Sequence, residues 1–242
     1  MKHKHKSLKV IFLYIPLGYI AASILLVTML KWIPVAGTPL MLKRCFDGTV
    51  EKGLRTSYRW RPIEEISPNM IRSVIASEDQ KFLTHNGFDV EEIQKMKKKR
   101  DKDGSPIRGC STISQQTAKN CFTSGSRTWV RKIFEAYYTV LIEKIWGKRR
   151  IMEVYLNVVE LGQKTYGVEA AAMKYYNISA SKLSLNQSAA LTCCLPNPLK
   201  RTPEWVGRHM ASRRSDVARM AGYQDISIIQ EKKSKKNKAG TN

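Results

Sequence analysis

Glu78 is the residue whose surroundings in this sequence most directly suggest acid–base chemistry. On a helix at about 100° per residue it falls within one stripe with Ile71, Val74, Ile75 and Phe82. A carboxyl group among apolar side chains loses hydration, which raises its pKa toward neutrality and suits it to general base work on a hydroxyl group. A structural Glu paired with a buried Arg would give the same pattern, so periodicity leaves both interpretations open.

Four ordered motifs resemble those of the peptidoglycan glycosyltransferases, glycosyltransferase family 51. Residues 78–89 (EDQKFLTHNGFD) match the first motif, E-D-x-x-F-x-x-H-x-G-x-D, at every fixed position. The second, third and fourth motifs are similar to residues 109–120 (GCSTISQQTAKN), 131–135 (RKIFE) and 148–157 (KRRIMEVYLN), and Arg213-Arg214 fits a looser fifth. Each motif alone would be only a hypothesis, but chance agreement of four in order is negligible.

The resemblance implies an enzyme that joins lipid II units into β-1,4 glycan strands and releases undecaprenyl diphosphate, for cell-wall synthesis. The resemblance is to the monofunctional biosynthetic members of the family, which lack a penicillin-binding domain. It implies a mainly helical, lysozyme-like domain. The implied partners are lipid II, the growing glycan strand and the cytoplasmic (inner) membrane, with other cell-wall synthesis or division proteins as further candidates. Nucleic acid has no implied role.

The same resemblance implies roles for individual residues. Glu78 would take the proton from the acceptor's 4-hydroxyl, while the departing diphosphate needs positive charge and hydrogen-bond donors. Charge-assisted hydrogen bonds contribute about 1.5–3 kcal/mol each, so losing two or three would disable the site. The implied substrate-binding residues are Asp79, Ser111, Gln115, Gln116, Lys119, Asn120, Arg127, Arg131 and Lys132.

Glu135 is the second catalytic carboxylate that the resemblance implies. Near the leaving group it would position a cationic side chain or a divalent cation such as Mg²⁺ or Mn²⁺; no cofactor is otherwise implied as required. A surface i, i+4 pair with Arg131, worth about 0.2–0.5 kcal/mol, is the alternative. Arg131, Glu135, Tyr138 and Ile142 share one face of a helix whose other faces are also largely apolar, which predicts burial and favours the functional role.

Other polar residues of the motifs are expected to be structural. His85 is predicted to support the first-motif loop by hydrogen bonding, since the resemblance gives base work to Glu78. Glu153 and Asn157 lie one helical turn apart and are read as structural on that spacing. Cys110 departs from the family, which usually has Gly or Ala there, and an exposed thiol would be prone to oxidation.

These residues need helices to position them, and helical signals dominate the sequence. Ser67-Pro68 predicts the start of a helix running to about residue 84. Ser184 and Gln187 form a candidate capping box for a helix over 185–195, and Thr202-Pro203 opens another to about 221. Sustained β alternation is absent, so the predicted class is all-α or nearly so.

Residues 10–30 predict one N-terminal transmembrane helix. They contain no charged residue and would form a helix about 31 Å long, which matches the hydrocarbon thickness of a bilayer. Lys31-Trp32 follows in place of a small-residue cleavage site, which favours an anchor over a cleaved signal peptide. Lysines crowd the N-terminal side, so the positive-inside rule predicts a cytoplasmic N-terminus and a periplasmic catalytic domain.

The predicted organisation has five parts. They are a cytoplasmic tail (1–9), the anchor (10–30), a connector (31–60), the glycosyltransferase domain (61–222) and a basic disordered tail (223–242). A basic run over 95–102 is also expected to be a mobile, solvated segment.

The chain carries 42 Lys and Arg against 20 Asp and Glu, a net charge of +22, which indicates a polyanionic partner without choosing among nucleic acid, acidic membrane and phosphorylated substrate. Its five cysteines have no zinc-type spacing, and adjacent Cys193 and Cys194 are expected to be small buried hydrophobes.

Two other classes of function compete with the polymerase. One is a membrane-anchored, lysozyme-like glycan hydrolase, which would need two carboxylates flanking a glycosidic bond and would not explain a cationic diphosphate cluster. The other is a basic, membrane-tethered binding protein without catalysis.

Overall fold

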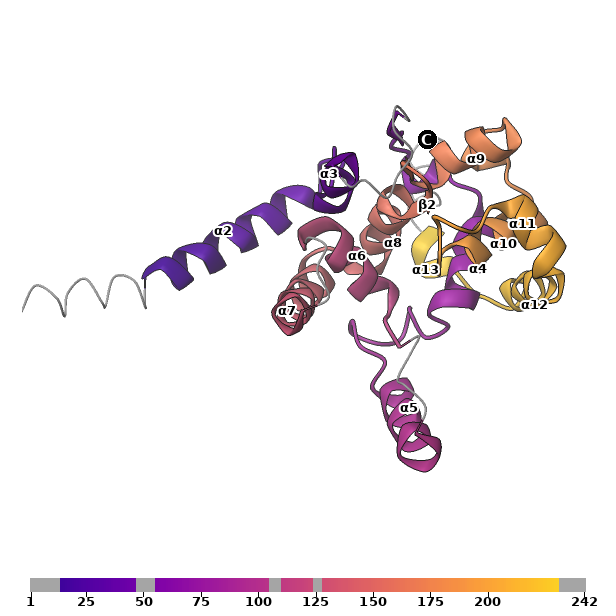
Figure 1. Cartoon of the computed structure of the whole chain (residues 1–242). Coiled ribbons are helices and arrows are strands. Elements are labelled where there is room, and N and C mark those ends of the chain that lie inside the picture. Colours follow the sequence, from indigo (N-terminus) through magenta and orange to yellow (C-terminus); the bar gives the residue numbers. More distant parts are fainter. Residues whose placement is uncertain (1–13, 47–54, 105–109, 124–127, 231–242) are drawn as a thin grey trace, which may run out of the picture.

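The computed structural model describes residues 14–46, 55–104, 110–123 and 128–230, and it is mainly helical, as predicted (Figure 1). The helices are α2 (Ile15–Leu30), α3 (Pro39–Phe46), α4 (Pro68–Glu78), α5 (Val90–Asp103), α6 (Ile113–Phe122), α7 (Trp129–Ile145), α8 (Gly147–Val158), α9 (Val168–Tyr176), α10 (Leu185–Cys194), α11 (Pro203–His209), α12 (Ala211–Ala221) and α13 (Ser227–Gln230).

A small sheet completes the described architecture. Strands β1 (Ser57–Tyr58), β2 (Glu160–Gly162) and β3 (Thr165–Tyr166) lie in the order β1-β3-β2, with β1 parallel and β2 antiparallel to β3. Strands of two or three residues are too short to show alternation in the sequence, so they were not predicted.

The core joins two helical groups. Helix α4 packs on α10 and α12, whereas α6 packs on α7 and α8. The largest fully buried side chains include Tyr155, Met152, Ile75 and Ile113, which come from α8, α4 and α6. The ends of α4 and α6 that carry the first two motifs are therefore held by buried helix surfaces.

Helix α4 is shorter than predicted. Ser67 caps its start, with the Ser67 side chain accepting from the Asn69 backbone N–H at 3.3 Å. The helix ends at Glu78 because Asp79 leaves helical geometry (φ −164°, ψ 79°) and turns its carboxylate toward α6. Phe82 is fully buried, as the stripe predicted, but it reaches the core from the loop that follows.

The basic run over 95–102 forms a helix, which the sequence did not predict, and its exposure agrees with the solvated segment expected there. Asp89 caps the start of α5 by accepting from the Glu92 N–H at 2.9 Å, and Gly104 ends it in left-handed geometry. None of the residues of α5 is buried, and the helix projects from the rest of the molecule (Figure 1). Its charged side chains suit a solvated helix as well as a disordered segment, and the caps decide between them.

The C-terminal region differs from prediction in two places. The single helix expected from Pro203 to Ala221 is split at Met210 (φ −136°, ψ 34°), which packs on the apolar cluster of Cys193, Cys194 and Val206. The ordered domain also continues past Gly222 through α13, because Ile226 and Ile229 are buried and Arg149 donates to the Ile229 carbonyl. Residues 231–242, with most of the predicted tail, lie outside the described residues.

Helix α2 is the described part of the predicted anchor; its predicted beginning lies outside the described residues. Within the portion of the chain that is described, no helix combines the length and apolar character needed to cross a membrane. Helix α2 packs on α7, and Trp146 Nε1 donates to the Val27 carbonyl at 2.7 Å. Arg150 donates to the carbonyls of Leu30 (2.8 Å) and Ile33 (2.6 Å), which fixes the end of α2 on α8.

Candidate active site

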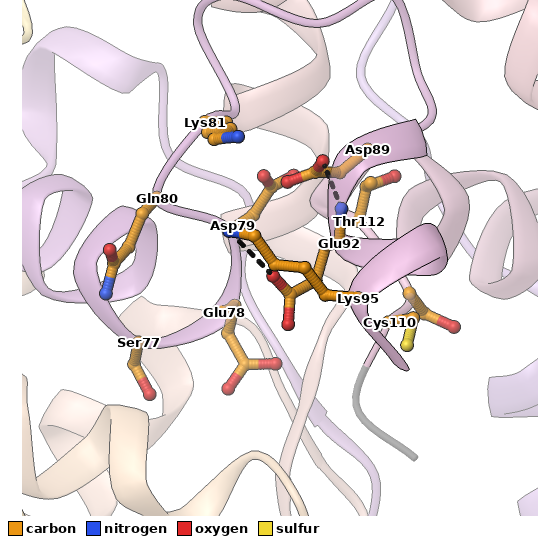
Figure 2. A pocket seen from close by; sticks show the side chains of 11 residues that line it. Ser77, Glu78, Asp79, Gln80, Lys81, Asp89, Glu92, Lys95, Cys110 and Thr112 are labelled. Carbon is orange, nitrogen blue, oxygen red and sulfur yellow. Dashed lines mark hydrogen bonds and ion pairs between the residues drawn. The ribbon is translucent and has the colours of Figure 1, made fainter. Parts of the chain in front are cut away.

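Glu78 lies at the end of α4, on the wall of a cavity of about 290 Å³ (Figure 2). Ser111, Thr112 and Cys110 approach the cavity from the start of α6, and Lys95 reaches it from α5. The Gln116 side-chain amide donates to Glu78 Oε2 at 3.0 Å. A carboxylate held in this way leaves its other oxygen available to an incoming hydroxyl group.

The environment of Glu78 raises its pKa, which is the direction that the apolar stripe predicts. Burial is the main cause, and the Asp79 carboxylate adds to it. The Gln116 hydrogen bond and the positive charges of Arg213 and Lys119 act in the opposite direction without reversing the shift. The result is a base stronger than an exposed Glu and still within reach of positive charge.

The first-motif loop braces the start of α6. His85 Nε2 lies 2.9 Å from both Asp79 oxygens, and the Gly87 N–H donates to His85 Nδ1 at 3.0 Å. Because Nδ1 accepts, Nε2 carries the proton and donates to Asp79. Asp79 Oδ2 also accepts from the Ile113 N–H at 3.0 Å. His85 therefore has the supporting role predicted for it.

Two residues predicted to bind substrate have their side chains engaged inside the protein. Asp79 lines the cavity, but both of its oxygens are taken by His85 and Ile113. Gln115 is buried and forms a capping box with Thr112 at the start of α6, which confines its side chain to the helix end. A family motif records which residues recur, and it cannot separate those that touch substrate from those that shape the site.

The remaining second-motif residues divide by exposure. Ser111 is exposed beside Glu78, and its carbonyl accepts from Gln116 at 3.4 Å. Lys119 reaches solvent with part of its side chain although protein surrounds the rest, whereas Asn120 is buried. The structure therefore brings Ser111, Gln116 and Lys119 to the surface that a substrate would meet.

A cationic cluster of Lys119, Arg131 and Lys132 surrounds Glu135, which is only 2% exposed. Arg131 Nη1 lies 2.7 Å from Glu135 Oε2, and Lys132 donates to Oε1. Desolvation by the surrounding protein lowers the pKa of Lys119, which the Glu135 charge opposes and the Arg131 and Lys132 charges reinforce. Three cations around one carboxylate leave net positive charge for an anionic ligand. Arg127, also predicted here, lies outside the described residues.

The burial predicted for α7 holds only on the face of Glu135, Tyr138 and Ile142, and Arg131 on that face is partly exposed. Other apolar residues of α7 are not covered: Trp129 is 87% exposed, and Val130 and Ile133 are also exposed. The apolar composition of these faces therefore marks an exposed apolar surface.

The fourth motif is mostly structural, as predicted for two of its residues. Asn157 Oδ1 accepts from the Arg61 N–H at 2.7 Å and its Nδ2 donates to the Arg61 carbonyl. Glu153 accepts from the Ile63 N–H and pairs with Arg150 at 2.7 Å. Both residues tie α8 to the chain that precedes α4.

Sequence reasoning missed two contributors to the site. The buried Tyr155 hydroxyl donates to Gln116 Oε1 at 3.2 Å, and Arg213 Nη2 lies 3.4 Å from Ser77 Oγ, next to Glu78. Their positions in the fourth and fifth motifs were a signal, but the contacts join helices far apart in the chain.

Cys110 is partly buried, and its thiol pKa is raised by burial and by the nearby carboxylates of Glu92 and Asp89. The protonated thiol is therefore favoured, which makes it less reactive than the exposed thiol expected. Cys193 and Cys194 are fully buried in an apolar cluster, as predicted.

The divalent cation suggested near Glu135 stays a prediction. Within the described ranges there is no cluster of three or more His, Cys, Asp or Glu side chains that could hold a metal ion. The Glu135 carboxylate meets Arg131 and Lys132 instead.

Comparison with known proteins places this site in a family. The family model described as Transglycosylase matches residues 48–221. The chain is 46% identical to the biosynthetic peptidoglycan transglycosylase of Caulobacter vibrioides over 90% of this chain and 92% of the relative. It is 42% identical to the proteins of that name from Chromohalobacter salexigens (82% of this chain, 89% of the relative) and Bacteroides thetaiotaomicron (84% and 82%). Because the family model covers most of the chain and these relatives match it over most of both lengths, the chain belongs to the transglycosylase family.

Proposed function

We propose that this peptidoglycan glycosyltransferase polymerises lipid II into β-1,4 glycan strands and releases undecaprenyl diphosphate, with Glu78 as the general base. The supporting observation is the arrangement along α6. Gln116 holds Glu78 and Lys119, one turn later, lies with the cations around Glu135. Glu78 and Lys119 are close enough to shift each other's pKa values. One helix thus joins a desolvated base to a patch of positive charge.

The reaction uses both ends of this arrangement. Glu78 takes the proton from the 4-hydroxyl of the acceptor as its oxygen attacks the anomeric carbon of the donor. The bond between that carbon and the diphosphate breaks, and Lys119, Arg131 and Lys132 stabilise the charge that develops on the leaving group. Exposed Ser111 supplies a neutral contact beside the base.

Glu135 acts by positioning cations in this scheme. Its ion pairs hold Arg131 and Lys132 side by side on α7, which limits their rotamers before the diphosphate arrives. A divalent cation bound to Glu135 would have to displace one of these side chains. The two ion pairs therefore favour cationic side chains over Mg²⁺ or Mn²⁺ as the partners of Glu135.

We place the enzyme at the cell inner membrane, with residues 10–30 as a single-pass anchor, the N-terminus cytoplasmic and the catalytic domain periplasmic. Leu17, Leu25 and Met29 are exposed on α2, and Trp129 and Ile133 are exposed on α7, which packs beside α2. Exposed apolar side chains on two helices that pack on each other are suited to contact with lipid. A substrate with a polyprenyl tail would then approach the cationic cluster of α6 and α7 from the lipid.

A glycan hydrolase is less compatible with this site. Hydrolysis by two carboxylates requires both to reach the glycosidic bond. Glu135 is buried and paired with two cations. Three other carboxylates line the cavity with Glu78, but Asp79 is held by His85 and Ile113. Asp89 caps α5, and Glu92 lies 3.9 Å from Lys95.

Incubation of the full chain with lipid II in detergent tests the proposal. Glycan polymer longer than the dimer is the expected product. Cleavage of preformed glycan would favour the hydrolase, and the absence of both reactions would favour a binding protein.

A further inference from the structure

Tyr155 is a buried titratable residue that the proposed reaction does not use directly. It lies on α8 with no exposed surface, and its hydroxyl donates to Gln116 Oε1 at 3.2 Å. The other end of the same amide donates to Glu78 Oε2 at 3.0 Å. A hydrogen-bonded chain therefore runs from the core helix α8, through α6, to the end of α4.

Tyr155 sets the direction of this chain from one end, and two acceptors of Gln116 Nε2, the Glu78 carboxylate and the Ser111 carbonyl, set it from the other. Burial, with the Glu78 and Asp79 charges, raises the pKa of Tyr155 well above its usual value, so the hydroxyl stays protonated. A hydroxyl that donates to Gln116 selects the amide orientation with Oε1 toward α8 and Nε2 toward Glu78. The opposite orientation would set an amide oxygen against a carboxylate.

We propose that Tyr155 is a positioning residue for glycan polymerisation, whose hydroxyl orients the Gln116 amide so that Gln116 holds the Glu78 carboxylate facing the acceptor hydroxyl. The inference rests on the proposed base role of Glu78. It gives Gln116 a contact with the base in addition to the substrate contact implied by the family motif.

The other groups that face Glu78 do not replace this contact. Arg213 on α12, Lys119 on α6 and Asp79 act on Glu78 through charge, whereas Gln116 is its hydrogen-bond donor in the described residues. Without the donor, the ionised form of Glu78 loses stabilisation and needs a higher pH to form.

The test is the pH dependence of lipid II polymerisation by the full-length Tyr155→Phe variant, which keeps the ring and removes the hydroxyl. We expect kcat at neutral pH to fall about five- to tenfold, KM to stay within about twofold, and the acid limb of the kcat profile to move upward by about half a pH unit, as expected for losing one hydrogen bond. Raising the pH should restore part of the rate.

Tyr166→Phe is the matched control. Tyr166 is also fully buried, but it lies in β3 beside Glu160 and away from Glu78. Its variant should keep the wild-type acid limb. A shift of the same size in Tyr166→Phe would mean that loss of any buried hydroxyl perturbs the site, and it would overturn the proposal.

A double-mutant cycle that combines Tyr155→Phe with Gln116→Ala tests whether the two residues act through one contact. If Tyr155→Phe folds poorly, Gln116→Ala alone still tests the proposal. Gln116→Ala alone should shift the acid limb in the same direction, and adding Tyr155→Phe should shift it little further. An unchanged acid limb in Gln116→Ala, or additive shifts in the double variant, overturns the positioning role while leaving polymerisation by the wild type intact. No polymer from the wild type would overturn the proposed function, and this inference with it.

Discussion

The two ends of α6 are built in different ways. Around Glu78 the contacts are hydrogen bonds of 2.9–3.2 Å among buried or partly buried groups, made by Gln116, Tyr155 and the Asp79–His85 brace. At Glu135 a buried carboxylate holds Arg131 and Lys132, whose side chains are partly exposed at the start of α7. Packing fixes the base, whereas charge fixes the cations. Added salt should therefore change the contacts of Glu78 little, whereas substitutions that shift nearby side chains should change them strongly. The cationic cluster should be weakened by salt and depend less on small shifts of side chains.

The largest effect should come from removing the base. Glu78→Gln keeps the side-chain shape but cannot accept the hydroxyl proton, so we expect polymerisation to fall by about 10³-fold or more. Lipid II binding, measured separately, should stay near wild type because the cationic cluster is untouched. Appreciable remaining turnover would remove Glu78 from the base role.

The same variant should not be destabilised at neutral pH. The folded-state pKa of Glu78 lies above its unfolded value, so the stabilising protonated form is lost as pH rises through the folded pKa. Above that pH the ionised Glu78 weakens the fold, and Gln removes the charge. Thermal melts at acidic and neutral pH would show this as a gain in relative stability of the variant as pH rises.

The second effect in size should come from the other end of α6. Glu135→Gln removes the charge that pairs Arg131 with Lys132, and we expect kcat/KM to fall on the order of 100-fold, corresponding to two weakened charge-assisted hydrogen bonds. Glu91→Gln, which breaks the exposed pair with Lys81, is the control and should change kcat/KM by less than twofold. Similar effects of the two substitutions would make Glu135 an ordinary ion-pair residue.

A third effect should appear in the first-motif loop, which leads from Glu78 to α5 and passes beside α7. Gly87 has φ +93°, and a Cβ there would lie 2.8 Å from Thr139 Cγ2 on α7. Gly87→Ala should lower the free energy of unfolding by about 1–3 kcal/mol, measured by urea denaturation. Gly104→Ala, also at positive φ but with open space around it, should cost less, about 1 kcal/mol. Equal costs would mean that backbone strain alone decides and that Gly87 does not fix the loop against α7.

The smallest effect should appear in the pH profile of the rate, where Glu78 and Lys119 at the two ends of α6 should control different limbs. The rate should rise as Glu78 ionises, through a pKa above its usual 4.5, and fall as Lys119 loses its proton, below its usual 10.5. Lys119→Arg keeps its charge to higher pH. Its kcat/KM profile should therefore lose the alkaline limb and keep the acid limb near its original place. An alkaline limb that does not move would belong to another group.

The sequence predicted the chemistry of this site better than its construction. Periodicity placed Glu78 among apolar side chains and so predicted the direction of its pKa, because burial of a helix face follows from sequence spacing. It also extended α4 through Phe82, since a buried loop residue and a helical one look alike on a wheel. The roles of Asp79, Gln115 and Tyr155 depend on contacts with other helices, which no local pattern contains.

Side-chain hydrogen bonds attach the C-terminal end of α2 to α8. Arg150 donates hydrogen bonds to the carbonyls of Leu30 and Ile33 and forms an ion pair with Glu153. Trp146 donates to the Val27 carbonyl, one turn earlier in α2. Tyr155 lies farther along the same α8. Hydrogen bonds from Arg150 and Trp146 therefore join the C-terminal end of α2 to the helix that carries Tyr155. A substitution of Arg150 would loosen a link between the N-terminal helix and the helix that orients the base.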